Sequence, residues 1–328
     1  MLNFILHRSL ILVPFLFLIS IIAFTVIQLP PGTYVDTYVN NLKLQGGTVS
    51  EEQKESIEAM YGLDRSLPVQ YGIWITNIVL RGNFGNSFRY NRPVADILRE
   101  RVPRTVSISL VAILLTWLIA VPLGILSAVK QYSFWDHLFT FISLIGLAVP
   151  GFLLALILMY AVYAKTGWMI SGLFSPEFRA GPWSFAKFAD MLKNIWLPLL
   201  VLSITGIAGI IRVLRASLLD ELNKQYVTTA RAKGLSEWQL IMQYPIRIAL
   251  NPLISTIGWM LPAVVGGEIV VSKVLNLPTT GPILLEATTT QDMYLAGGIV
   301  LILSFLTVIG TFVSDILLAI NDPRIRIH

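Results

Sequence analysis

The chain of 328 residues contains no cysteine and only three histidines, His7, His137 and His328. Without cysteine there are no disulfides, no thiolate metal sites and no cysteine nucleophile, and three scattered histidines supply few ligands for a metal ion. The chain also has no Gly-Lys pair, so it lacks a phosphate-binding loop of the Walker A type. We therefore expect a protein that is not an enzyme and that has no catalytic residue, metal or cofactor.

Charge is also scarce, at 13% of residues, against roughly 25% in soluble domains. Hydrophobic residues make up 55%, and they gather into runs of about 20 residues, the length that crosses a bilayer as a helix. Only Glu268 and Asp315 interrupt these runs, which do not alternate in polarity as barrel strands do. The pattern predicts an all-α polytopic membrane protein with six transmembrane helices, at residues 9–29, 105–129, 138–164, 194–211, 251–271 and 296–320.

The loops between these runs set the orientation, because cytoplasmic loops of membrane proteins carry an excess of lysine and arginine. With the amino terminus inside, the short loops hold 10 basic residues inside and 5 outside, so we expect both termini in the cytoplasm. The net charge of +5 then reflects orientation rather than nucleic-acid binding. The chain divides into an N-terminal cytoplasmic tail with the first span (residues 1–29), an extracytoplasmic segment (30–104), and a core with the other spans and a cytoplasmic loop over 212–250 (105–328).

The extracytoplasmic segment is expected to form a small helical cap between the first two spans. Ser50 and Gln53 have the spacing of a capping box, which predicts a helix over residues 50–60. A second, amphipathic helix is expected over 68–80, and its apolar stripe should rest on the membrane or on the helix bundle; the stripe comprises Tyr71, Trp74, Ile75 and Ile78. Residues 82–88 are rich in glycine, but without a following helix and lysine they predict a structural turn rather than a nucleotide site.

Proline and glycine recur inside four neighbouring spans: Pro122, Gly124, Gly146, Pro150, Gly151, Pro198, Gly206, Gly209, Gly258, Pro262, Gly266 and Gly267. They are explained either by kinked helices that line a pathway or by close helix packing through small residues. We take Pro150, Pro262 and Glu268 as candidate pathway or gate residues, and for Glu268 a structural hydrogen bond is an equal alternative. Asp315, near the inner end of the last span, is expected to make a structural polar contact.

The cytoplasmic loop over 212–250 keeps a helical apolar spacing, which a solvated loop does not need. Its centre, residues 226–238, predicts a short helix of small residues that Gly234 ends in a left-handed conformation. Ser236 can then cap a second helix from Glu237. We call this two-helix segment the elbow; its small residues and basic rim suit a groove on another protein, or alternatively a surface of anionic lipid.

Within the elbow, the stretch Thr228-Thr229-Ala230-Arg231-Ala232-Lys233-Gly234 resembles the cytoplasmic coupling loop of binding-protein-dependent ABC importer permeases, particularly their dipeptide, oligopeptide and nickel branch. The similarity runs nearly end to end and includes residues 82–88, 101–105, 119–124, 146–150 and 315–326. It implies the type I ABC importer permease fold and assigns these seven residues to coupling with the ATPase. It also implies a bacterial or archaeal cytoplasmic (inner) membrane and four protein partners: a second, homologous permease subunit in a heterodimer, two ATP-binding subunits and an extracytoplasmic substrate-binding protein.

The sequence departs from the branch pattern at several positions, namely Tyr244, Ser272 and residues 278–281. We therefore expect the cargo to be oligopeptides or oligosaccharides, with nickel less favoured because no histidine lies in a predicted span. The alternative function is an ion-coupled secondary transporter that uses Glu268 and Asp315. An intramembrane enzyme is disfavoured, because no nucleophile has an evident base.

Overall fold

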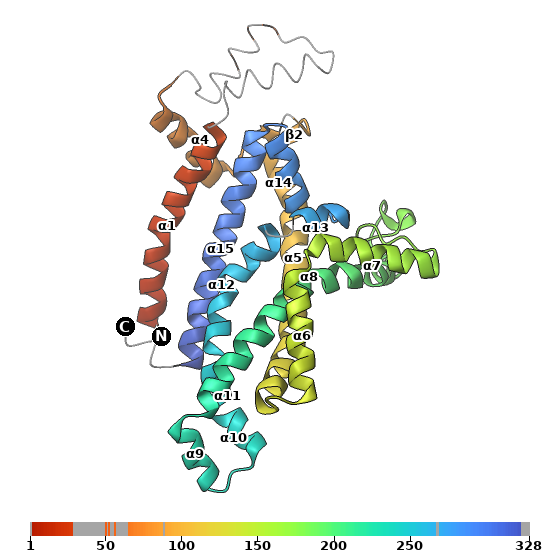
Figure 1. Ribbon diagram of the computed structural model, residues 1–328. Helices are drawn as coiled ribbons and strands as arrows, with labels where there is room; N and C mark the ends of the chain where they lie inside the picture. Colours follow the sequence, from red (N-terminus) through yellow and green to blue (C-terminus); the bar gives the residue numbers. More distant parts are fainter. Residues whose placement is uncertain are drawn as a thin grey trace. The chain divides into compact units, whose positions relative to one another are not determined.

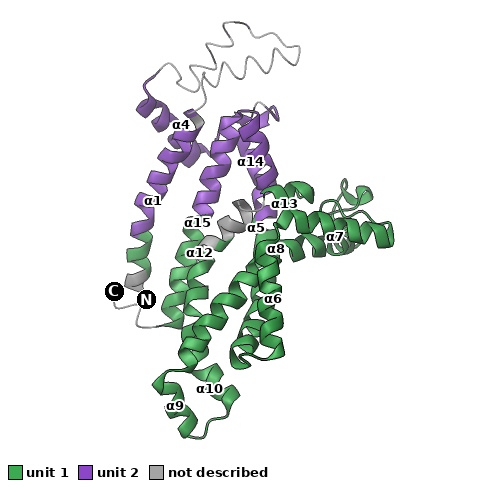
Figure 2. Ribbon diagram, viewed as in Figure 1, with its two compact units in different colours: residues 1–9, 106–278, 307–328 green, residues 10–105, 279–306 purple. Residues whose placement is uncertain are grey.

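The computed structural model describes residues 2–28, 50, 52, 56, 65–87, 89–266 and 269–322. The chain forms two compact units, drawn in different colours in Figure 2. Unit 1 comprises residues 1–9, 106–278 and 307–328, and unit 2 comprises residues 10–105 and 279–306. Each unit therefore combines segments that are far apart in the sequence.

Four helices are long and apolar enough to cross a membrane (Figure 1). They are α1 (Leu2–Gln28), α5 (Val94–Val129), α8 (Phe185–Leu222) and α15 (Met293–Asn321). The helices α6 (Phe134–Ala148) and α7 (Gly151–Thr166) pass the same test as a pair, bent by 103°. The predicted fifth span begins as α12 (Asn251–Gly266), which has 16 residues and is followed by two residues outside the described ranges. Six spans thus remain a prediction, of which the described residues supply four single helices and one bent pair.

The other described elements are short and are found between the long helices. They are α4 (Leu67–Arg81), β1 (Asn86–Ser87), β2 (Arg92–Pro93), a 3-10 turn (Pro176–Phe178), α9 (Gln225–Ala232), α10 (Glu237–Gln243), α11 (Pro245–Ala249), α13 (Ile269–Val274) and α14 (Thr280–Thr289). The two strands pair antiparallel, with Asn86 opposite Pro93. The predicted helix over 50–60, with its Ser50 and Gln53 cap, lies almost entirely outside the described residues.

The sharp bend of the third predicted span is explained by Pro150. Proline has no amide hydrogen to continue a helix, and its ring pushes the preceding residue into the extended region. Val149 accordingly has φ −87° and ψ 121°, and α7 starts directly after Pro150. The sequence predicted a kink in one continuous span over 138–164, whereas the structure has two separate helices.

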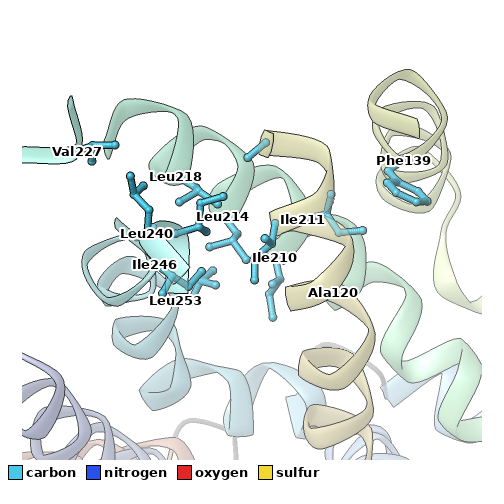
Figure 3. Close-up of a cluster of buried hydrophobic side chains, with 14 of the residues drawn as sticks. Ala120, Phe139, Ile210, Ile211, Leu214, Leu218, Val227, Leu240, Ile246 and Leu253 are labelled. Carbon is cyan, nitrogen blue, oxygen red and sulfur yellow. The ribbon is translucent and has the colours of Figure 1, made fainter. Parts of the chain in front are cut away.

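One buried cluster of unit 1 surrounds the C-terminal half of α8, and another surrounds its N-terminal half. In the first, Ile210, Ile211, Leu214 and Leu218 recur on α8 at helical spacing and are buried. Side chains from α5, α6, α9, α10, α11 and α12 complete this cluster; Figure 3 labels Ala120, Val227, Leu240, Ile246 and Leu253 among them. The elbow is therefore packed onto the transmembrane part of its own chain.

The core of unit 2 contains the apolar stripe of α4. Tyr71, Trp74, Ile75 and Ile78 belong to a cluster with Phe24 of α1 and with residues of α5, α14 and α15. The sequence predicted that this stripe rests on the membrane or on the helix bundle, and in the structure it packs on the helix bundle.

The turn after α4 is tied to the start of α15, as expected for a structural turn. The carboxylate of Asp292 accepts hydrogen bonds from the Ser87 hydroxyl and from the Arg89 amide, the latter at 3.2 Å. Glu286 accepts hydrogen bonds from Arg89 Nε and from the Tyr90 hydroxyl, both at 2.7 Å. Burial, followed by the hydrogen bond to Glu286, raises the pKa of Tyr90 to about 12. These contacts hold residues 86, 87 and 89–92 against the helix pair α14 and α15.

Candidate functional site

The elbow has the two-helix form that the sequence predicts. Helix α9 ends at Ala232, Gly234 has a left-handed φ of 84°, and α10 begins at Glu237. Ser236 occupies the N-cap position, but its side chain makes no capping hydrogen bond and instead contacts Gln239 Oε1 at 2.9 Å. The prediction that Ser236 is the N-cap residue is thus correct, but the predicted hydrogen bond between its side chain and the helix is not formed.

The seven candidate coupling residues do not share one face of the elbow. Ala230 is buried with Val227 in the cluster around α8. The other six are exposed: Thr228, Thr229, Arg231, Ala232, Lys233 and Gly234. Ala230 therefore anchors the elbow within its own chain, and the other six residues lie on the exposed surface of the elbow.

Polar contacts fix the shape of this surface. Arg231 forms a bidentate ion pair with Glu237 across the Gly234 turn, with Nε–Oε1 at 2.5 Å and Nη2–Oε2 at 3.1 Å. The hydrogen bonds from Arg231 lower the pKa of the Glu237 carboxyl. The Tyr226 hydroxyl donates to Glu221 Oε2 at 2.6 Å, and burial followed by this bond raises the pKa of Tyr226. The turn and the junction with α8 are each held by a specific pair.

Near the same end of α8 lies a buried ion pair that sequence reasoning missed. Asp136 of α6 accepts hydrogen bonds from Arg215 Nε at 2.6 Å and Nη2 at 2.7 Å. It also accepts the Tyr132 amide at 2.9 Å and the Ser127 hydroxyl. Ser133 and Asp136 have capping-box spacing, which marks the start of a helix in the sequence. Nothing in the sequence connects this start with Arg215, which is 79 residues away.

Unit 1 also contains a cavity of about 540 Å³. Its wall comes from α5, α6, α7, α8, α12 and α13, and it includes Pro150, Gly146, Gly206 and Gly209. No charged side chain is among the described residues that line it. Of the candidate pathway residues, Pro150 thus lies at the cavity; Glu268 and the side chain of Pro262 lie outside what the structure describes.

Some of the intramembrane glycines allow close helix packing, and others line open space at the cavity. A Cβ added at Gly258 would lie 2.8 Å from the backbone of Thr311, and one at Gly206 would lie 3.0 Å from Thr116. These two glycines permit close helix packing. A Cβ at Gly209 would meet nothing within 4 Å, and this residue lines the cavity. Small residues therefore serve packing at some positions and leave open space at others.

Asp315 makes the structural contact expected of it. Its carboxylate lies 3.4 Å from Arg8 Nη1, and both residues belong to unit 1. The beginning of α1 and the end of α15 are joined by this ion pair.

Comparison with known proteins decides the family. The model of the binding-protein-dependent transport system inner membrane component matches residues 120–327, and that of the N-terminal part of such components matches residues 1–109. The chain belongs to this family. It is a permease subunit of an ABC importer and a multi-pass protein of the inner membrane, as the resemblance implied. The alternative of an ion-coupled secondary transporter is therefore set aside.

Several relatives of this permease are similar over their whole length. A putative peptide permease protein of Brucella suis biovar 1 (strain 1330) is 34% identical over 329 residues, covering 100% of both chains. The oligopeptide transport system permease protein AppB of Bacillus subtilis (strain 168) is 33% identical over 327 residues, covering 98% of this chain and 99% of its own. The corresponding protein OppB of Haemophilus influenzae is 31% identical, covering 99% and 100%.

The permease also resembles a solved structure, the MetNI methionine ABC transporter in an inward-facing conformation. The TM-score is 0.52 at 16% identity, covering 69% of this permease and 96% of that chain. This similarity shows the fold, that of a type I importer permease.

Proposed function

We propose that this permease forms half of a pathway for oligopeptides that an extracytoplasmic binding protein delivers. A second, homologous permease forms the other half, and two ATP-binding subunits act on the cytoplasmic side. The full-length similarity to permeases named for peptides and oligopeptides supports this cargo. The same relatives give no support to oligosaccharides, the other cargo that the sequence left open.

The packing of the elbow on α8 is the observation that carries the mechanism. Leu214 and Leu218 of α8 belong to the buried cluster that contains Val227 and Ala230 of the elbow. The preceding turns of the same helix line the cavity, and Ile210 belongs both to the cavity wall and to the buried cluster. A displacement of the elbow by the ATPase is passed along α8 to the cavity, which gives alternating access a mechanical route.

The cavity itself suits a cargo of variable chemistry. Its described wall offers aliphatic side chains and three threonine hydroxyls, Thr116, Thr205 and Thr256, but no charge. A wall without charge does not select peptides of one sign, so selectivity is left to the binding protein. Calorimetry of that binding protein against panels of peptides and glycans tests the cargo; binding of glycans without peptides contradicts it.

The orientation follows from charge and from one contact. The short loops place the elbow and both termini on the basic, cytoplasmic side. The Arg8–Asp315 ion pair supports both termini lying on one side of the membrane, because it joins the beginning of α1 to the end of α15. Single substitutions Asn40→Cys, Ser175→Cys and Ser236→Cys test it, and only the first two are expected to react with an impermeant label in intact cells. Labelling of Ser236→Cys from outside contradicts this orientation and indicates the opposite one.

Two alanines in the elbow provide a matched test of coupling. Ala232 is exposed, so Ala232→Glu leaves the packing intact and places a carboxylate in the surface open to the ATPase. We expect it to release the ATPase or to abolish peptide-stimulated hydrolysis, whereas Ala232→Ser retains both. Ala230→Glu instead buries a charge in the core and is expected to destabilise the elbow itself.

The measurements are ATPase retention and binding-protein-dependent, peptide-stimulated ATP hydrolysis in proteoliposomes. If Ala232→Glu equals Ala232→Ser in both, the elbow surface has no coupling role, and the lipid-surface alternative gains support. The proposal of a peptide cargo is unaffected by that outcome, because the calorimetry of the binding protein tests it separately.

A further inference from the structure

Unit 2 contains a second cavity, of about 360 Å³, whose wall combines apolar, polar and basic side chains. It is formed by α4, by the turn after it, by both short strands, by the N-terminal turns of α5 and by Tyr294 at the start of α15. Arg81 and Arg99 both line it, together with Trp74, Asn77 and other residues. None of these residues contributes to the elbow or lines the larger cavity in unit 1.

The cavity lies at the level where a membrane meets water. The ring of Trp74 is 5.7 Å from that of Phe24, and the apolar span of α1 ends at Val26. On α5, the uncharged run of the second span starts at residue 105, six residues after Arg99, which corresponds to about 9 Å of helix. Both helices thus place the cavity at the edge of the hydrocarbon, the depth of lipid headgroups.

Three residues that line this cavity carry hydrogen-bond donors: Trp74, Arg81 and Arg99. Trp74 is only 6% exposed, and its indole Nε1 is buried without an acceptor among the described residues. Arg81 is exposed, and no ion pair involving it is found within the described part of the chain. Arg99 lies 3.6 Å from Asp96, the one acidic side chain in this turn of α5. The amides at the N-terminus of α5, beside Pro93 and Ala95 of the wall, add a favourable dipole.

The last turn of α4 also exposes apolar side chains. Val79 and Leu80 are 71% and 76% exposed, whereas Trp74 of the same helix is buried. They directly precede Arg81, so the surface changes from aliphatic to cationic within one helical turn. An acidic side chain of a soluble partner matches the cationic part only, whereas a phospholipid matches both parts.

We propose that this cavity binds the phosphate of an anionic phospholipid, with Arg81 and Arg99 pairing with the phosphodiester. The indole of Trp74 donates a hydrogen bond to the same headgroup, and an acyl chain lies along Leu80. Guanidinium groups pair with phosphate oxygens through parallel, charge-assisted hydrogen bonds, which makes arginine suited to this role. The site would hold α4 and the start of α5 at the membrane surface.

The test uses the purified permease complex in nanodiscs that contain phosphatidylglycerol and phosphatidylcholine in equal amounts. Native mass spectrometry after partial delipidation measures which lipid the permease retains. The variants are Arg81→Gln, Arg81→Gln with Arg99→Gln, and Trp74→Phe, which keeps an aromatic ring beside Phe24. Arg92→Gln is the matched control, because Arg92 is paired with Glu100 at the same end of α5 but does not line the cavity.

We expect the parent and Arg92→Gln to retain phosphatidylglycerol in preference to phosphatidylcholine. Since a basic residue near a membrane surface contributes about 1 kcal/mol, each lost arginine should lower the preference about fivefold. Trp74→Phe should lower it as well, and excess inorganic phosphate should not displace the lipid.

Equal retention in the parent and in the double variant overturns the proposal. It is also overturned if the double variant keeps its lipid but loses affinity for the binding protein, because the site then belongs to an acidic side chain of that partner. Displacement by inorganic phosphate alone would mean a free-anion site, which equally contradicts a lipid site.

Discussion

The buried ion pair between Asp136 and Arg215 provides the sharpest test of how this permease is held together. Asp136 is 2% exposed and accepts four hydrogen bonds, of which two come from the Arg215 guanidinium, whose side chain is 27% exposed. Removing one partner of a buried pair costs about 3 to 5 kcal/mol, because the other charge stays buried and unpaired. Since part of Arg215 reaches water, we expect Asp136→Asn to cost about 3 kcal/mol, at the lower end of that range.

The assay is thermal unfolding of the purified permease in detergent, followed by the fraction that remains soluble. Asp136→Asn should lower the melting temperature by several degrees. Arg231→Gln is the control, since it breaks an exposed pair and should leave the melting temperature close to that of the parent. The double variant Asp136→Leu with Arg215→Met should recover much of the loss, because it leaves no unpaired charge. The reasoning is refuted if Asp136→Asn melts with the parent, or if Arg231→Gln loses as much.

Three further predictions concern backbone geometry, packing and pH. Gly234→Val should strain the elbow by about 1 to 3 kcal/mol, because φ is 84° there, and should increase its proteolysis while Gly234→Asn does so less. Gly258→Ala should lower the melting temperature more than Gly209→Ala, because only its new Cβ meets backbone, at 2.8 Å from Thr311. Burial raises the pKa of Asp292 above 3.8, so the folded state binds its proton more tightly than the unfolded state. The stability of the parent relative to Asp292→Asn should therefore be greatest below pH 3.8 and should fall as pH rises through the raised pKa; a pH-independent difference in melting temperature contradicts this.

The sequence predicted the helical class and most of the long helices for a simple physical reason. Hydropathy and run length are properties of the chain in one dimension, and the bilayer, not the fold, sets the required length. The same holds for the turn at Gly234 and the break at Pro150, since both follow from what glycine and proline allow locally. The size of the bend between α6 and α7, 103°, does not follow from local sequence, because it depends on what packs against the two helices.

The candidate site was predictable only in part. The elbow was visible as a small-residue helix followed by glycine, and the helical spacing of Val227 and Ala230 set these two apart from Ala232. What the sequence did not show is the surface that this stripe packs against, which is the cluster around α8.

By itself, the sequence determined that this chain spans a membrane, which family it resembles and where its coupling segment lies, because each of these depends on local composition or on motifs. Only the tertiary structure decided that Asp136 meets Arg215, that Gly209 opens onto a cavity while Gly258 packs against a helix, and that Trp74 and Arg81 share a cavity. Such contacts join residues distant in the chain. They depend on the direction in which each helix presents its side chains, and one-dimensional patterns do not record that direction.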